Sequence, residues 1–122
     1  MAKLATGGAP GESRRITRDE AAAMVPTAAG RRDVAVFAHG TLVVEYYAPA
    51  GVDRQTPHAR DELYVVLSGT GWFVNGDERH PFAPGDVLFV PAGTVHRFED
   101  FTEDFATWVM FYGPDGGERE GG

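Results

Sequence analysis

Residues 85–96 read Gly-Asp-Val-Leu-Phe-Val-Pro-Ala-Gly-Thr-Val-His, and the rest of the chain is organised around this stretch. A Gly-Asp turn is followed by four apolar residues, which is typical of a short strand. The proline and the second glycine then predict a tight turn, and His96 opens the next strand. This turn returns His96 toward a space that Val87 and Phe89 are expected to line. An imidazole at the mouth of a β-barrel is a candidate metal ligand.

The composition fits one domain of 122 residues. Cysteine is absent, which excludes disulfides and thiolate metal ligands. A formal net charge of −7 disfavours nucleic acid as a partner, because an acidic surface repels phosphates. The apolar runs are too short to span a membrane, and the N-terminus lacks the apolar core of a signal peptide. We therefore expect a cytoplasmic protein with neither a membrane nor a nucleic acid as partner.

We expect a single barrel domain over residues 14–113. Residues 1–13 are small and polar and contain Gly and Pro, and residues 114–122 are rich in Gly and Glu, so both ends are predicted to be flexible. Thr17 and Glu20 have the spacing of a capping box, which predicts a short N-terminal helix.

Strands dominate the rest of the chain. The expected strands are Val34–Ala38, Thr41–Ala48, Leu63–Leu67, Thr70–Val74, a strand at Phe82, Val87–Val90, Val95–Phe98 and Phe105–Tyr112. A His-Gly pair at 39–40 and an Asn-Gly pair at 75–76 predict hairpin turns. Alternation places Glu45 on the solvent face, together with Val43 and Tyr47, which would need burial in an interface. About eight short strands predict an all-β sandwich or barrel.

Two of the four histidines have the setting of metal ligands. His39 and His80 lie in predicted turns and are expected to face solvent. His58 precedes Glu62 by four residues, so an extended chain puts both side chains on one face. A buried unpaired carboxylate costs several kcal/mol, and a divalent ion shared with two imidazoles would offset that cost. The set His58, Glu62 and His96 has the composition of a two-His-one-carboxylate site.

Two alternatives stay open for these residues. Glu62 can pair with Arg60, and His58 can lie on the rim of the barrel. Tyr64 continues the face of Glu62, where its hydroxyl is either an acid/base near the metal or bonded to a local partner. Phe98 shares a face with His96 and is a candidate pocket residue.

The two segments resemble the paired motifs of the cupin superfamily of small β-barrels. The first family motif, G-x5-H-x-H-x3,4-E-x6-G, is matched in part by Gly51…His58-x3-Glu62-x6-Gly69. The second, G-x5-P-x-G-x2-H-x3-N, is matched by Gly85-x5-Pro91-x-Gly93-x2-His96-x3-Asp100, with Asp in place of Asn. The resemblance implies a double-stranded β-helix, also called a jelly roll.

The resemblance also implies a ligand set. Three metal ligands of the family correspond to His58, Glu62 and His96. The position of the first histidine of the family motif is occupied here by Thr56. Gln55, one position away, is a candidate fourth ligand, and a metal-bound water beside Thr56 is the alternative. The expected pocket residues are Thr56, Tyr64, Phe89 and Phe98.

The function implied by the resemblance is that of a metal-binding cupin with a small-molecule pocket. The metal is expected to be Fe(II), with Mn, Ni or Zn as alternatives, and the enzyme would be of dioxygenase or isomerase type. A homodimer is expected. The rival hypotheses are a non-catalytic binder or sensor, with or without metal, and a metal-free isomerase that uses His58 or Tyr64 as acid/base.

Overall fold

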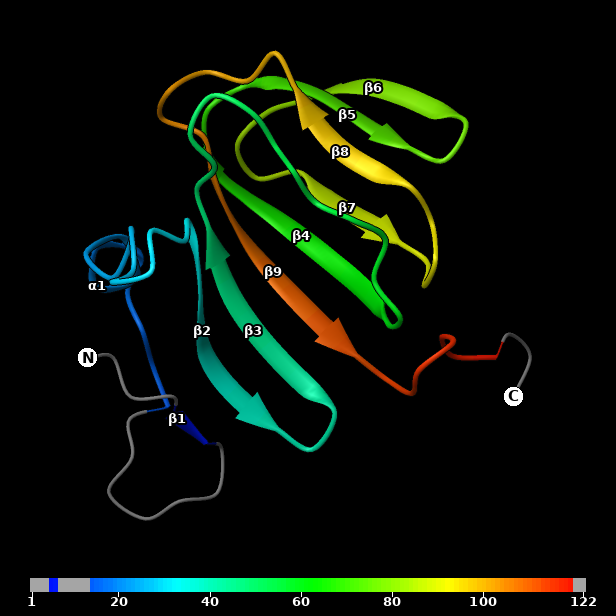
Figure 1. The fold of residues 1–122 in the computed structure, drawn as a ribbon, viewed down its shortest axis with the longest axis horizontal. Helices are drawn as coiled ribbons and strands as arrows, with labels where there is room; N and C mark the ends of the chain where they lie inside the picture. The colour runs from blue at the N-terminus through cyan, green and yellow to red at the C-terminus, as the bar shows by residue number, and fades with distance from the viewer. Residues whose placement is uncertain (1–4, 7–13, 120–122) are drawn as a thin grey trace.

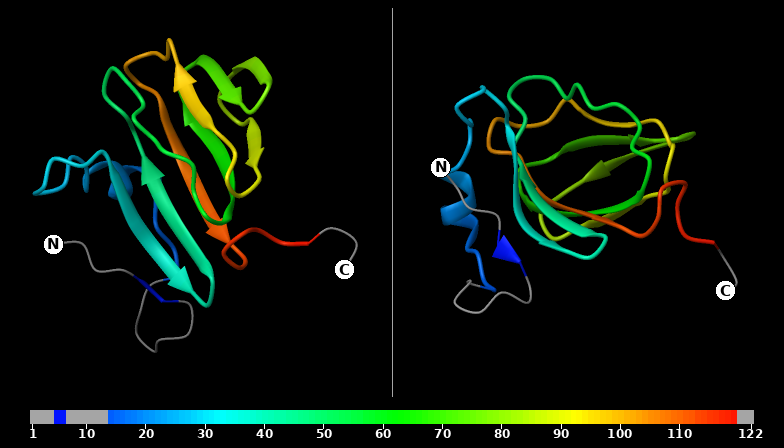
Figure 2. Two further views of the ribbon diagram at one scale, coloured as in Figure 1. Left: turned by 45° about the vertical axis from the view of Figure 1, so that its right-hand side comes forward. Right: turned by 60° about the horizontal axis from the view of Figure 1, so that its bottom comes forward.

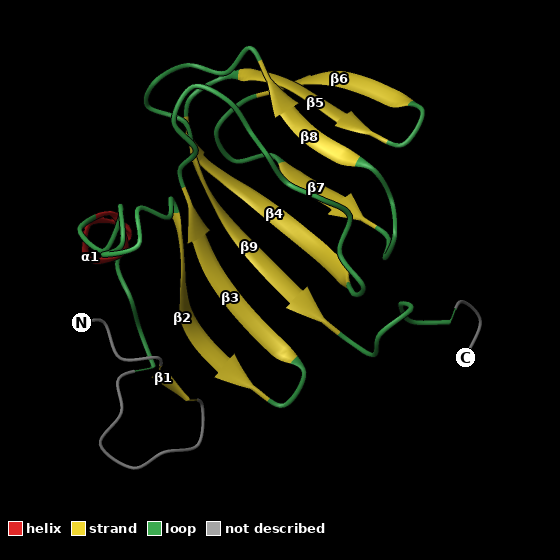
Figure 3. Cartoon of the chain, viewed as in Figure 1, coloured by secondary structure: helices red, strands yellow, loops and turns green. Residues whose placement is uncertain are grey.

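The computed structural model describes residues 5–6 and 14–119, and the described chain is almost entirely β-structure (Figure 3). Its helix α1 covers Arg18–Ala22. Its strands are β1 (Ala5–Thr6), β2 (Asp33–His39), β3 (Leu42–Tyr47), β4 (Asp61–Ser68), β5 (Gly71–Asn75), β6 (Glu78–Phe82), β7 (Val87–Val90), β8 (His96–Glu99) and β9 (Ala106–Tyr112). Apart from β1, the flexible N-terminus predicted at 1–13 lies outside the described residues.

The strands form two facing sheets (Figure 1). The larger has the order β1-β2-β3-β9-β4-β7 and the smaller has the order β6-β5-β8. All pairings are antiparallel except β1 with β2. Figure 2 looks along the space between the sheets, which the connecting loops close into a barrel. The predicted double-stranded β-helix is confirmed.

Aromatic side chains fill one part of the barrel interior. Phe98 lies at the centre of this group, with ring centroids 4.6 Å from those of Phe73 and Phe105 and 5.0 Å from that of Tyr64. Burial of such rings supplies most of the favourable free energy of a small β-barrel. His96 borders this aromatic cluster, with its ring centroid 6.2 Å from that of Tyr64 and 6.4 Å from that of Phe73.

A second apolar cluster lies on the outer face of the larger sheet, where α1 packs. The predicted capping box is confirmed, because Glu20 N donates to Thr17 Oγ1 and Thr17 N donates to Glu20 Oε1, each at 3.1 Å. Ala21 on the helix is fully buried against Val36 and Tyr46 of the sheet. Strand β3 is therefore covered on both faces.

This double coverage makes the prediction for β3 wrong. Tyr46 faces the helix, so Glu45 and Tyr47 face the barrel interior rather than solvent. Tyr47 packs against the interior cluster, and its hydroxyl donates to Asp53 at 2.6 Å. Because both faces of β3 carry large apolar residues, alternation of polarity does not indicate which face is inside.

The prediction for β7 is wrong in the same way. Leu88 and Val90 point into the core, whereas Val87 and Phe89 are 62% and 48% exposed. All four residues are apolar, so the sequence does not indicate which of them face the core and which face solvent. The expected homodimer stays a prediction.

Two further details differ from the expected turns. The β5–β6 turn is centred on residues 76–77, because Asn75 still pairs with Glu78 in the ladder. Only Gly76 of the Asn-Gly pair has a positive φ, of 60°, and the Asn75 side chain donates to Phe89 O at 2.8 Å instead. His80 lies within β6 rather than in a turn.

The segment predicted to form a flexible tail after residue 113 makes specific contacts. Gly116 N donates to Ala59 O at 2.6 Å, and Glu118 N donates to Asp61 Oδ2 at 2.8 Å. The other carboxylate oxygen of Asp61 accepts from Ala92 N at 2.9 Å. Asp61 therefore joins this segment to the turn between β7 and β8.

Gly69 ends the first cupin motif at a point where the backbone has no room for a side chain. Its φ is 84°, and a Cβ there would lie 2.5 Å from Phe105 Cα. We expect Gly69→Ala to lower the free energy of unfolding by about 3 kcal/mol or more, measured by urea titration. Gly85→Ala is the matched control, with a φ of 90° and no atom within 4 Å of the added Cβ. Equal losses in the two variants would show that the clash with Phe105 has no effect.

Candidate metal centre

Strand β4 supplies the carboxylate of the site. Along this strand Glu62, Tyr64 and Val66 are buried, while the residues between them are only partly covered. This pattern confirms that the three side chains share the interior face. Glu62 is 0% exposed, which is unusual for a carboxylate and requires a partner.

Strand β8 supplies an imidazole with a defined tautomer. The predicted turn before it is present, with Thr94 N donating to Pro91 O at 3.2 Å. His96 Nδ1 lies 2.8 Å from Thr94 O, so Nδ1 carries the proton and donates it to that carbonyl. His96 Nε2 is left with a free lone pair that points into the interior. This is the usual arrangement of a metal-binding histidine.

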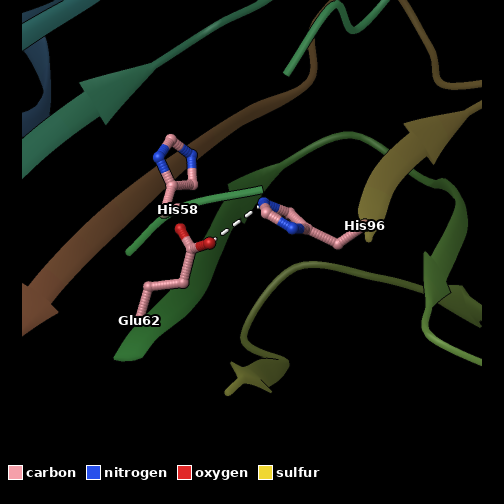
Figure 4. Close-up of side chains that lie close together, drawn as sticks. All are labelled: His58, Glu62 and His96. Atoms are coloured by element: carbon pink, nitrogen blue, oxygen red, sulfur yellow. Dashed lines mark ion pairs between the residues drawn. The ribbon is translucent and has the colours of Figure 1, made fainter. Parts of the chain in front are cut away.

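His58 reaches the same point from the loop before β4. His58 lies outside strand β4. Its side chain therefore reaches Glu62 because the loop folds back over the barrel, and not because the two residues alternate along one strand. Gly93 N holds this loop by donating to His58 O at 2.8 Å, and the His58 ring stacks edge-on against Phe111 at 4.9 Å. Figure 4 shows the side chains of His58, Glu62 and His96 converging.

The distances at this cluster fit a bound cation. One donor atom from each of His58, Glu62 and His96 lies within 4.8 Å of the others. His96 Nε2 lies 2.9 Å from Glu62 Oε1. Two ligands at right angles on an ion with bonds of about 2.1 Å are about 3 Å apart, and opposite ligands are about 4.2 Å apart. The distance between His96 and Glu62 matches the first value, and the limit of 4.8 Å on the other separations is slightly above the second.

Hydrogen bonding leaves the same atoms without partners. His96 Nε2 and Glu62 Oε1 contact each other at 2.9 Å, but among the described residues neither oxygen of Glu62 nor His96 Nε2 meets the geometry of a hydrogen bond, although all three atoms are buried. Burial alone would lower the pKa of His96, but Glu62 and the Thr94 carbonyl outweigh it and raise that pKa. The Glu62 carboxylate that favours a proton on His96 would also attract a metal ion at the same point. The residues present therefore fit a divalent metal with two neutral nitrogens and one carboxylate.

Gln55 lies beside this cluster. Its Oε1 accepts from the Tyr64 hydroxyl at 2.9 Å and lies 3.4 Å from His58 Nε2. Its Nε2 donates to Asp53 Oδ2 at 2.9 Å. The structure thus places the candidate fourth ligand next to His58.

Tyr64 is poorly suited to acid/base catalysis. The residue is fully buried, and its hydroxyl is already bonded to Gln55. Burial, together with the charge of Glu62, raises the Tyr64 pKa well above its ordinary value, so the phenolate form is excluded near neutral pH. Tyr64 is a neutral donor that orients its neighbours.

A cavity of about 630 Å³ opens beside His58. Thr56 lines it, together with Gln55, Tyr47 and Phe111. The other three expected pocket residues do not line this cavity. Phe89 is 48% exposed on β7, and Tyr64 and Phe98 are buried in the aromatic core. The cavity walls come instead from β3, β9 and the loop before β4, which spacing within two motifs does not identify.

Glu45 is the cavity residue that sequence reasoning missed. Burial raises its pKa to about 7, and the charges of Asp33 and Glu62 act in the same direction against the opposing effect of Arg31. The Arg31 guanidinium instead holds Asp33 through bonds of 2.8 and 3.1 Å. The cavity therefore contains a carboxyl group that exchanges its proton near neutral pH.

The raised pKa of Glu45 makes stability depend on pH. Between pH 4.5 and 7 the folded protein holds a proton that the unfolded chain has released, so this contribution is full below pH 4.5 and is lost as pH rises through 7. We expect the free energy of unfolding of the wild type, measured relative to Glu45→Gln, to fall by about 1–3 kcal/mol from pH 4.5 to pH 8. Glu78→Gln, at an exposed position, is the control. A constant difference between wild type and Glu45→Gln would contradict the expectation.

The remaining candidates lie away from the cluster. Arg60 donates to Thr41 O, so its predicted alternative pairing with Glu62 is not formed. His39 is exposed at the end of β2, as expected, and His80 is half-buried on β6. No helix in the described part of the chain has the length and apolarity needed to cross a bilayer.

Comparison with known proteins agrees with this fold. A family model described as a cupin domain matches residues 43–112, which is more than half of the chain. The chain is 42% identical over 71 residues to the uncharacterised protein SCO3923 of Streptomyces coelicolor, covering 57% of this chain and 68% of that protein.

Two solved structures show the same architecture. One is the protein BH2720 of Bacillus halodurans, with a TM-score of 0.67, 16% identity and coverage of 92% of this chain and 88% of that one. The other is a Klebsiella pneumoniae protein with a double-stranded β-helix domain, with a TM-score of 0.63, 22% identity and coverage of 83% and 90%. The two motifs, the fold and the family match all agree. This chain therefore belongs to the cupin family.

Proposed function

We propose that this protein binds one divalent transition metal through His58, Glu62 and His96 and holds a small organic molecule in the adjacent cavity. The observation that carries the proposal is the fully buried contact of Glu62 Oε1 with His96 Nε2, at 2.9 Å, in which neither of these atoms nor Glu62 Oε2 meets hydrogen-bond geometry among the described residues. Leaving a carboxylate in this state costs several kcal/mol, and a cation removes the cost.

The protein residues have separate roles in this proposal. Glu62 supplies the negative charge, and the two imidazoles supply neutral nitrogens. The Thr94 carbonyl fixes the His96 tautomer, and Phe111 packs against His58. The metal would be Fe(II), or Mn, Ni or Zn, and when bound it would supply Lewis acidity or redox chemistry of the dioxygenase or isomerase type. Glu45 lies in the same cavity and can hold or release a proton at its carboxylate.

A non-catalytic binder or sensor is the second candidate. The buried state of Tyr64 favours it, because the acid/base expected beside the metal is occupied and inaccessible. For the same reason, Tyr64 is not a suitable acid/base for the metal-free isomerase hypothesis. That hypothesis then depends on His58 as the acid/base. Oxygen consumption across candidate substrates separates an enzyme from a binder. The cytoplasmic location and the homodimer stay predictions.

Elemental analysis tests the metal proposal. Protein purified without added metal should contain Fe, Mn, Ni or Zn, or should take up about one equivalent when the metal is supplied afterwards. Failure of the wild-type protein to bind any of these ions in either experiment would overturn the proposal.

A further inference from the structure

The carboxamide of Gln55 has a fixed orientation. Asp53 is buried and accepts four hydrogen bonds, from the Tyr47 hydroxyl, Gln55 N, Gln55 Nε2 and Phe98 N. Because the carboxylate of Asp53 only accepts, the end of the amide that faces it must be the nitrogen. Gln55 Oε1 is therefore directed the other way, toward His58 and Tyr64.

The distance from this oxygen to His58 is that of two ligands on one ion. Gln55 Oε1 and His58 Nε2 are 3.4 Å apart, which is longer than the usual N–H···O hydrogen bond of about 2.7–3.2 Å. Two ligands on an ion with bonds of about 2.1 Å are about 3.0–3.4 Å apart, depending on whether the angle between them is octahedral or tetrahedral. His58 belongs to the same cluster as Glu62, and the charge of Glu62 acts on Tyr64, which donates to Gln55 Oε1.

We infer that Gln55 Oε1 is a fourth ligand of the metal and that Asp53 is the positioning residue that presents it. The inference rests on the proposed metal site at His58, Glu62 and His96. The resulting donor set has two nitrogens and two oxygens, and only one of the four ligands is charged. Oxygen ligands suit harder ions such as Mn(II) and Fe(II) more than softer ones.

A purely supporting role for Gln55 makes a different prediction, because it would act through Tyr64. If Gln55 only holds the Tyr64 hydroxyl, Tyr64→Phe removes the same interaction as a change at Gln55. If Gln55 is a ligand, Tyr64→Phe only frees one lone pair of Oε1, and metal affinity stays equal or increases.

The test is the affinity of the whole protein for Mn(II) and Co(II), measured by competition with a chelator. We expect Gln55→Leu, which keeps the volume but lacks the oxygen, to bind each ion at least about tenfold more weakly. Tyr64→Phe should bind each ion at least as tightly as the wild type, and the control His39→Ala, at an exposed position outside the cluster, should bind within about twofold of the wild type. The visible spectrum of the Co(II) form should change in Gln55→Leu, because one ligand is lost.

The outcomes separate this inference from the proposed function. Wild-type affinity and an unchanged Co(II) spectrum in Gln55→Leu would overturn the fourth ligand and leave the three-residue site in place. An equal loss of affinity in Tyr64→Phe would overturn it too. Absence of metal binding in the wild type would overturn both. If Gln55→Leu does not fold, as judged by thermal unfolding, Gln55→Ala is measured with the same expected result.

Discussion

His96→Ala is expected to abolish stoichiometric metal binding. His96 Nε2 has a free lone pair, because Nδ1 donates to Thr94 O, and it lies 2.9 Å from the Glu62 carboxylate. Loss of a residue that merely orients a ligand costs about 10–100-fold in affinity, so loss of the ligand itself should cost more than about a hundredfold. Competition with a chelator and elemental analysis of the purified variant measure the effect.

His39→Ala is the matched control for this variant, because His39 is exposed at the end of β2 and does not belong to the cluster. It should bind metal as the wild type does. Since His96 is only 2% exposed, a cavity at this position also lowers stability, and His96→Gln keeps more of the volume. One equivalent of metal in a folded His96→Ala or His96→Gln protein would contradict the assignment of this imidazole as a ligand.

Glu62→Gln is expected to act in opposite directions on metal affinity and on the stability of the metal-free protein. The change keeps the shape of the side chain but removes a fully buried charge that lacks hydrogen bonds among the described residues. We expect affinity for the metal to fall by more than about a hundredfold. The free energy of unfolding without metal should rise by about 1–2 kcal/mol, because a neutral amide is less costly to bury than a carboxylate.

The adjacent acid provides the control. Asp61 accepts hydrogen bonds from Ala92 N and Glu118 N, so it has a structural role. Asp61→Asn should destabilise the protein and still bind metal, which is the reverse of the pattern for Glu62→Gln. If Glu62→Gln destabilises the metal-free protein or retains its affinity, Glu62 serves the fold rather than a metal.

The second motif shows how far the sequence predicts the site. Its turn and the inward direction of His96 follow from glycine and proline at fixed positions, and both are present. The phase of β7 does not follow, because its four residues are all apolar and neither face is marked by polarity. The turn is therefore predictable from its glycine and proline. Which side chains of β7 point inward depends on which part of the barrel packs against the strand.

The cavity shows the same limit. Glu45 has the sequence pattern of a surface residue, and only the packing of α1 on the opposite face of β3 turns it inward. The orientation of Gln55 depends on Asp53, which bonds to groups from β3, the loop and β8. Contacts between residues that are distant in the chain determine both, and no local pattern encodes them.

The contact between Asp61 and the C-terminal segment has a practical consequence for work with this protein. Glu118 and the turn before His96 share the two oxygens of one carboxylate, and that carboxylate belongs to the neighbour of Glu62. A truncation before Glu118 would remove one of the two backbone donors of this carboxylate, so it should lower the stability of the barrel as Asp61→Asn does. Stability measurements therefore need a chain that keeps Glu118.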